Sequence, residues 1–130
     1  MTSGQALSAA LAVIERDQLA AYTRIVDELG GIVISFDVGG ETFSVGCADR
    51  LRVSTSADLV PKVEVRTDRS AILALIDGEI ELLEAVTTRR LKIVANVSLM
   101  TRLARAERAF AEGAARARRI RPILEAYRAG

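Results

Sequence analysis

The sequence has no histidine, no tryptophan and a single cysteine. Without histidine, a Ser-His-Asp or Cys-His catalytic arrangement is excluded, and so is a metal site built on histidine. One cysteine forms no intramolecular disulfide, which favours a reducing compartment. Cys47 alternates with Phe43 and Val45 in a strand-like stretch. We therefore expect a small buried core residue at this position and not a nucleophile.

Aromatic residues and unbalanced charge are also scarce. The 130 residues include three phenylalanines and two tyrosines, and the net charge is +1. Few stacking side chains and no basic excess count against nucleic acid as a partner. No stretch approaches the roughly 18 uncharged apolar residues of a membrane span. The N-terminus lacks the basic start of a signal peptide. We expect a cytoplasmic protein, and the abundant alanine and arginine are typical of a bacterial source.

What is present is a globular balance, with 50% hydrophobic and 27% charged residues. The length predicts a single domain over residues 1–130. Residues 5–29 carry an apolar stripe with helical spacing, which includes Leu7, Leu11 and Ile14. The pattern allows a break near Arg16. Glycines at positions 30 and 31 are expected to end the helix.

From residue 32 the hydrophobic period changes to two, which predicts strands. Residues 32–38 and 42–47 alternate around Gly39 and Gly40, whose tolerance of positive φ favours a tight hairpin turn. Two further strands are expected at residues 51–55 and 63–65. The polar residues 54–58 and Pro61 mark a loop between them.

Residues 67–110 predict two short amphipathic helices broken at Gly78, a strand at 91–95 and a longer helix from Asn96. Thr67 or Asp68 is expected to cap the first of these helices. We expect Gly113 to weaken or end the long helix. Pro122 suits the first turn of a last helix, whose apolar face would be Ile123, Leu124 and Tyr127.

The residues from Asp68 to Asn96 resemble those of a known family. The features are an acidic start, an aliphatic run that ends in glycine, an alanine, and a strand of Leu-Lys-Ile type followed by a turn. They fall at Asp68, residues 72–76, Gly78, Ala85, residues 91–93 and Asn96. This pattern resembles the sterol carrier protein-2 family, the SCP2-like sterol-binding domain. Two places where members usually carry glycine hold Arg89 and Ala95 here.

The resemblance implies an α+β fold, an α/β sandwich. Its mostly antiparallel sheet of about five strands would have helices covering one face, with an apolar tunnel between them. The expected function is binding and carriage of a fatty acyl chain, a sterol-like molecule or another lipid, without cofactor or metal. We expect the ligand-binding residues to be the following aliphatic and aromatic set: Phe36, Phe43, Val45, Ile72, Ile76, Leu83, Leu99, Met100, Leu103 and Phe110.

Two alternatives stay open. The first is an enzyme or accessory factor of a lipid or natural-product pathway that folds or cyclises an apolar substrate in the same cavity. A buried carboxylate or arginine that points into the cavity would favour it, and a wholly aliphatic lining would count against it. The second is a homodimer in which the first and last helices cover each other's apolar stripes.

Each of two charged runs can be interpreted either as ordinary solvated surface or as a binding site. The acidic residues Asp77, Glu79, Glu81 and Glu84 alternate with apolar ones, so we expect a solvated helix face and not a cation site. The basic run consists of Arg116, Arg118, Arg119 and Arg121. We favour a solvated linker for it, with weak contact to anionic lipid head groups as the alternative.

Overall fold

The computed structural model describes residues 1–55 and 61–130. The chain begins with helices α1 (Ser3–Asp17) and α2 (Leu19–Leu29). Thr2 and Gln5 form a reciprocal capping box at the start of α1, which satisfies two backbone donors that the helix leaves free. The predicted break falls at Gln18, whose backbone leaves the helical region at φ −138° and ψ 59°. The helical residues expected across positions 5–29 are therefore confirmed as two helices.

In the part of the chain that the structure describes, five strands form one sheet: β1 (Val33–Val38), β2 (Glu41–Cys47), β3 (Leu51–Ser54), β4 (Val63–Thr67) and β5 (Lys92–Val94). Their order across the sheet is β3-β2-β1-β4-β5, and only the β1–β4 pair is parallel. Gly39 and Gly40 have φ of 60° and 90° in the β1–β2 hairpin, as the paired glycines predicted. The loop expected at residues 54–58 lies largely outside the described residues.

The predicted pair of short helices is present as α3 (Arg69–Ile76) and α4 (Leu82–Thr87). Asp68 caps α3 by accepting a hydrogen bond of 2.8 Å from the amide of Ala71. Gly78 has φ 72° in the link between the helices. Arg89 is the only non-glycine residue in the described part of the chain with positive φ, at 63°. The backbone of this turn therefore keeps a conformation that favours glycine, although arginine occupies it.

The chain ends with α5 (Val97–Arg116) and α6 (Ile120–Ala129). Gly113 was expected to weaken or end the long helix. It does not end it, because α5 continues for three residues beyond it, and a weakening of the helix stays a prediction. A Cβ atom at Gly113 would lie 3.0 Å from the Cβ of Ala21 and 3.3 Å from Ile14. Glycine is therefore used here for close approach between α5 and the first two helices, and not as a helix stop.

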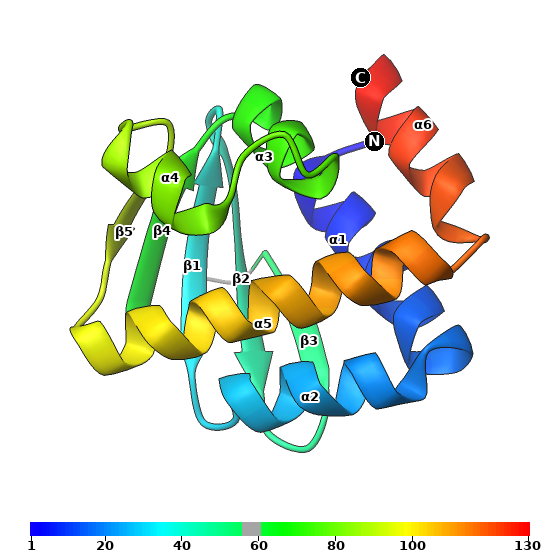
Figure 1. Ribbon diagram of the computed structural model, residues 1–130, viewed down its shortest axis with the longest axis horizontal. Helices are drawn as coiled ribbons and strands as arrows, with labels where there is room; N and C mark the ends of the chain where they lie inside the picture. Colours follow the sequence, from blue (N-terminus) through cyan, green and yellow to red (C-terminus); the bar gives the residue numbers. More distant parts are fainter. Residues whose placement is uncertain (56–60) are drawn as a thin grey trace.

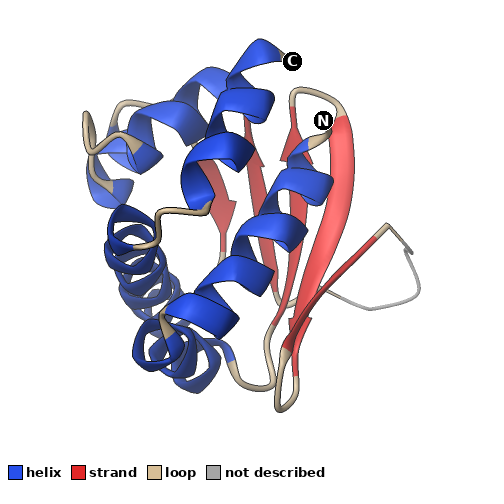
Figure 2. Ribbon diagram, turned by 90° about the vertical axis from the view of Figure 1, so that its right-hand side faces the viewer, coloured by secondary structure: helices blue, strands red, loops and turns tan. Residues whose placement is uncertain are grey.

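The six helices of the described residues lie on one face of the sheet, with α2 and α5 side by side and α6 beside the N-terminus (Figures 1 and 2). The inner face of the sheet presents apolar side chains, including Ile34, Phe43 and Val65, while Glu64 and Arg66 point outward and are exposed. The expected α+β fold, with a mostly antiparallel five-stranded sheet covered on one face, is thus confirmed.

Helices α1 and α6 bury their apolar faces within one chain. Leu11 and Ile14 of α1 are buried, as are Ile120 and Tyr127 of α6. These residues of the two stripes are thus buried without a second copy of the chain, and the homodimer stays a prediction.

Candidate functional site

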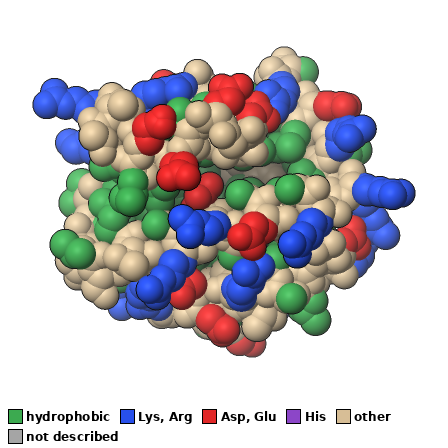
Figure 3. Space-filling model, in the orientation of Figure 1, with side chains coloured by type: hydrophobic (Ala, Val, Ile, Leu, Met, Phe, Trp, Pro, Cys, Tyr) green, Lys and Arg blue, Asp and Glu red, His purple; other side chains and the backbone are tan. Residues whose placement is uncertain are grey.

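A cavity of about 210 Å³ lies between the inner face of the sheet and the helices. The space-filling view shows the surface hollowed between α3 and α5, with hydrophobic and acidic side chains at the rim (Figure 3). Apolar cavities of about 150 Å³ already stay dry and bind small apolar molecules. Its wall is formed by the following residues: Ser3, Ala6, Leu7, Ala10, Leu11, Ile25, Leu29, Ile34, Phe36, Val38, Phe43, Val45, Leu51, Val65, Ile72, Leu75, Ile76, Leu82, Leu91, Ile93, Leu103, Ala106, Glu107, Phe110, Ile123, Leu124 and Tyr127.

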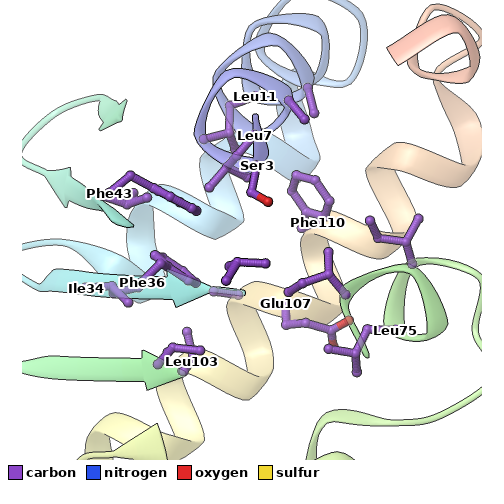
Figure 4. A pocket seen from close by; sticks show the side chains of 18 of the residues that line it. Ser3, Leu7, Leu11, Ile34, Phe36, Phe43, Leu75, Leu103, Glu107 and Phe110 are labelled. Atoms are coloured by element: carbon purple, nitrogen blue, oxygen red, sulfur yellow. The ribbon is translucent and has the colours of Figure 1, made fainter. Parts of the chain in front are cut away.

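The floor of the cavity follows from strand alternation. Every second residue of a strand points to the same face, which brings Ile34, Phe36 and Val38 of β1 beside Phe43 and Val45 of β2. The rings of Phe36 and Phe43 stack with centroids 4.9 Å apart. Helices α1, α3 and α5 supply the facing side chains, and the labelled residues of Figure 4 surround one common space.

A polar cluster borders the cavity where α1 and α6 meet. The hydroxyl of Ser3 lies 2.6 Å from that of Tyr127 and donates a hydrogen bond of 2.8 Å to the carboxylate of Glu41. Arg69 donates to the same carboxylate at 3.2 Å, donates to the Tyr127 carbonyl at 2.9 Å, and lies 4.5 Å from the centre of the Tyr127 ring. This cluster ties the first turn of α1 to β2, α3 and α6.

The protonation of the cluster follows from these bonds. Burial by itself raises the pKa of Glu41, but the hydrogen bonds from Ser3 and Arg69 outweigh it, so the pKa lies below its ordinary value. Burial raises the pKa of the Tyr127 phenol, against the opposing hydrogen bond with Ser3. Near neutral pH the cluster therefore holds an ionised Glu41 and a neutral Tyr127.

Glu107 is the second polar feature of the wall. It lies on α5 and is half-buried, and Figure 4 shows its carboxylate beside Leu75. Burial raises the pKa of this carboxyl; Arg108 lowers it in part and Glu81 raises it further. Among the described residues, no hydrogen-bond or ion-pair partner of the Glu107 carboxylate is recorded. The lining is therefore apolar but not wholly aliphatic.

Of the ten residues expected to contact a ligand, seven line this cavity: Phe36, Phe43, Val45, Ile72, Ile76, Leu103 and Phe110. The structure places Leu83, Leu99 and Met100 outside the lining. Leu83 is 61% exposed, because α4 turns its neighbour Leu82 inward instead. Leu99 and Met100 lie in the first turn of α5, before Leu103 brings the helix to the cavity. That any of these residues contacts a ligand stays a prediction.

The ten expected residues leave out much of the lining, and this includes every lining residue from the first and last helices. Helix α1 contributes Ser3, Leu7 and Leu11, and α6 contributes Ile123, Leu124 and Tyr127. Their helical stripes were visible in the sequence, but a stripe looks the same whether it faces a core or a cavity. No sequence pattern indicated that Glu107 lines the cavity, because it lies among the other charged residues of α5.

The five-stranded sheet covered on one face, with an apolar cavity beneath its helices, is an α+β fold, and the sequence assigns this fold to a known family. The model of the SCP-2 sterol transfer family matches residues 12–106. Since this is well over half of the chain, the protein belongs to the SCP-2 sterol transfer family. The match ends one residue before Glu107 and leaves out α6. No curated protein matches the sequence.

Solved structures share the fold at low sequence identity. The UbiJ-SCP2 ubiquinone synthesis protein has a TM-score of 0.61 and 18% identity, over 78% of this chain and 85% of its own. The sterol carrier protein domain 2 of Helicoverpa armigera has a TM-score of 0.60 and 18% identity, over 76% and 80%. Sterol carrier protein 2 from Yarrowia lipolytica has a TM-score of 0.53 and 16% identity, over 82% and 94%.

None of the described helices combines the length and the apolar character that crossing a membrane requires. The sole cysteine of the chain, Cys47, is buried and free. Burial raises the pKa of its thiol, and the charge of Asp49 adds to the shift. A thiol in this state is a poor nucleophile.

Proposed function

We propose that this protein binds and carries a hydrophobic small molecule in the cavity between sheet and helices. The ligand would be a fatty acyl chain, a sterol-like molecule or another lipid. One observation carries the proposal: the cavity is walled almost entirely by Leu, Ile, Val, Ala and Phe side chains that come from the sheet and from several helices.

The physical reason is the cost of unfilled apolar space. Side chains around a void lose dispersion contacts. A ligand that fills the void also buries its own apolar surface, which contributes about 25 cal/mol per Å² to the free energy of binding. The polar cluster of Ser3, Glu41, Arg69 and Tyr127 already satisfies its own groups, so it needs no ligand head. An apolar ligand would therefore fill the cavity without breaking the hydrogen bonds of this cluster.

The test is extraction of the purified protein with organic solvent, followed by mass spectrometry of the extract. We expect a lipid in a fixed ratio to protein. A delipidated sample should then take up a fluorescent fatty acid or sterol analogue in a saturable manner. Protein that carries no lipid and binds none of these probes would contradict the proposal.

A second candidate is an accessory factor or enzyme that folds or cyclises an apolar substrate in the same cavity. Two observations favour it: Glu107 offers a carboxyl with a raised pKa in the lining, and a ubiquinone synthesis protein shares the fold. Incubation with a polyprenyl substrate separates the two candidates. A carrier returns the compound chemically unchanged, whereas an enzyme returns a product that depends on Glu107.

We also propose a weak contact between the basic run at the α5–α6 junction and anionic lipid surfaces. Arg116, Arg118, Arg119 and Arg121 are all exposed, and only Arg119 has a recorded ion-pair partner among the described residues, Asp17 at 3.3 Å. Each such residue contributes about 1 kcal/mol near an anionic surface. Co-sedimentation with vesicles rich in phosphatidylglycerol, at low and high salt, tests this contact.

A further inference from the structure

The polar groups of the cavity wall differ in whether they are satisfied. Ser3 and Tyr127 bond to each other at 2.6 Å, and Ser3 also donates to Glu41. Glu107 has no recorded partner among the described residues, although apolar side chains such as Leu75 and Phe110 surround its end of the cavity (Figure 4). A carboxylate in apolar surroundings is costly unless a donor reaches it. Among the polar side chains that line the cavity, Glu107 is therefore the one whose carboxylate could gain a hydrogen bond from the polar head of a ligand.

The charges around Glu107 decide which head fits. No Lys or Arg side chain among the described residues lines the cavity. The charged side chains that shift the pKa of Glu107 are Arg108, on the same helix, which lowers it, and Glu81, at the start of α4, which raises it. A carboxylate head would therefore meet a like charge with no cation of the wall to offset it. A hydroxyl or ammonium head would instead donate to Glu107 and remove its desolvation cost.

We infer that Glu107 selects amphiphiles whose polar head donates a hydrogen bond, a hydroxyl or an ammonium group, over amphiphiles that end in a carboxylate. The apolar chain lies in the cavity, and the head lies at the half-buried carboxylate on α5. This inference rests on the proposed carriage of a lipid, and it narrows the class of ligand. Bonds to a charged acceptor are the strong ones, so selection of about tenfold is expected from this single residue.

The experiment compares three ligands that share one saturated chain and differ only in the head: hexadecanol, hexadecylamine and hexadecanoate. Each displaces a bound pyrene-labelled hydrocarbon from the delipidated full chain at about pH 8, well above the ordinary pKa of a carboxyl group. The wild-type protein should bind the amine and the alcohol about tenfold more tightly than hexadecanoate. Glu107→Gln should reduce this preference about tenfold, and Glu107→Lys should reverse it in favour of hexadecanoate.

Glu112→Gln is the matched control, because it removes the same charge from the same helix. Glu112 pairs with Arg24 at 3.1 Å and lies outside the cavity wall, so the preference should not change. Equal weakening of all three ligands by Glu107→Gln, or tightest binding of hexadecanoate to the wild-type protein, would overturn the inference. Failure of every ligand and of the hydrocarbon probe to bind any variant would instead overturn the proposed carriage of a lipid.

Discussion

The hydroxyl groups of Ser3 and Tyr127 lie 2.6 Å apart although the two residues are separated by 124 positions in the sequence. This bond joins the first turn of α1 to the last turn of α6, and both residues line the cavity. Arg128, the next residue of α6, bonds to Asp77 at the end of α3. The last helix is thus held over the cavity by polar contacts at its end.

The first prediction concerns this bond. Tyr127→Phe keeps the ring and removes the hydroxyl, so Ser3 loses one partner but keeps Glu41. We expect the free energy of unfolding to fall by about 1 kcal/mol, the usual net contribution of one hydrogen bond. Urea unfolding measures the change.

A double-mutant cycle with Ser3→Ala is the control for this prediction. If the two hydroxyls interact, the double variant should be more stable than the sum of the single changes implies, with a coupling of at least about 0.5 kcal/mol. Strict additivity would mean that the two groups do not interact in solution.

The second prediction concerns Arg89, whose positive φ is a backbone conformation that favours glycine. A left-handed backbone costs a residue with a Cβ roughly 1 kcal/mol or more, and Arg89 has φ 63°. Arg89→Gly should therefore raise the free energy of unfolding, by about 0.5–1 kcal/mol after allowing for the greater freedom of glycine in the unfolded chain. Thermal and urea unfolding both report the gain.

Arg89→Ala separates backbone strain from loss of the side chain. Alanine removes the guanidinium as glycine does, but it keeps the Cβ atom that makes positive φ costly. We expect no stabilisation from alanine. Equal stabilisation by alanine and glycine would assign the effect to the side chain and contradict the argument from backbone strain.

Much of the fold was readable from the sequence because each element has local cues. Gly39 and Gly40 between two alternating runs predicted the hairpin, and the break at Gly78 separated α3 from α4. The role of Gly113 could not be predicted from the sequence, because it depends on Ala21 and Ile14, which lie close to it across a helix interface. A close approach between distant segments leaves no local pattern.

The cavity was less predictable than the fold for a related reason. Leu83 and Leu82 are adjacent in a helix of six residues, too short for periodicity to decide which one faces inward. Tyr127 and Leu7 were readable as apolar helix positions, but only the tertiary arrangement turns them toward a space instead of a packed core. The sequence therefore predicts apolar surface well and the shape of what it encloses poorly.

The third prediction is a pH dependence at Glu107. Burial raises the pKa of its carboxyl above the ordinary value of 4.5, with Arg108 opposing and Glu81 adding to the shift. The folded chain thus holds the proton more tightly than the unfolded chain, and stability falls as the pH rises from 4.5 through the raised pKa. Glu107→Gln removes this loss.

Urea unfolding of the two proteins at several pH values measures the difference. At about pH 4 they should be equally stable, and at about pH 8 the glutamine variant should be more stable, by less than about 1 kcal/mol because the side chain is only partly buried. A difference that is the same at both pH values would show that the carboxyl titrates alike in the folded and unfolded chain. Glu112→Gln should not produce this pH profile.

The fourth prediction fills the cavity. Ala106 is a small residue of α5 that lines it, so Ala106→Leu places a larger apolar side chain in the space proposed for the ligand. We expect the affinity for a fluorescent fatty acid to fall by about tenfold or more, since the lost burial amounts to at least 1.4 kcal/mol at about 25 cal/mol per Å². The folded protein should not lose stability, because the leucine enters a void and not a packed core.

Ala109→Leu is the matched control, because Ala109 is buried on the same helix but does not line the cavity. A leucine there enters packed surroundings, and overpacking should destabilise the fold by about 1–3 kcal/mol. Unfolding experiments and binding titrations should thus separate the two variants, one with weakened binding and unchanged stability, the other with lowered stability. If Ala106→Leu destabilises as much as Ala109→Leu, the space beside Ala106 is not open in solution, and the cavity is not the site of binding.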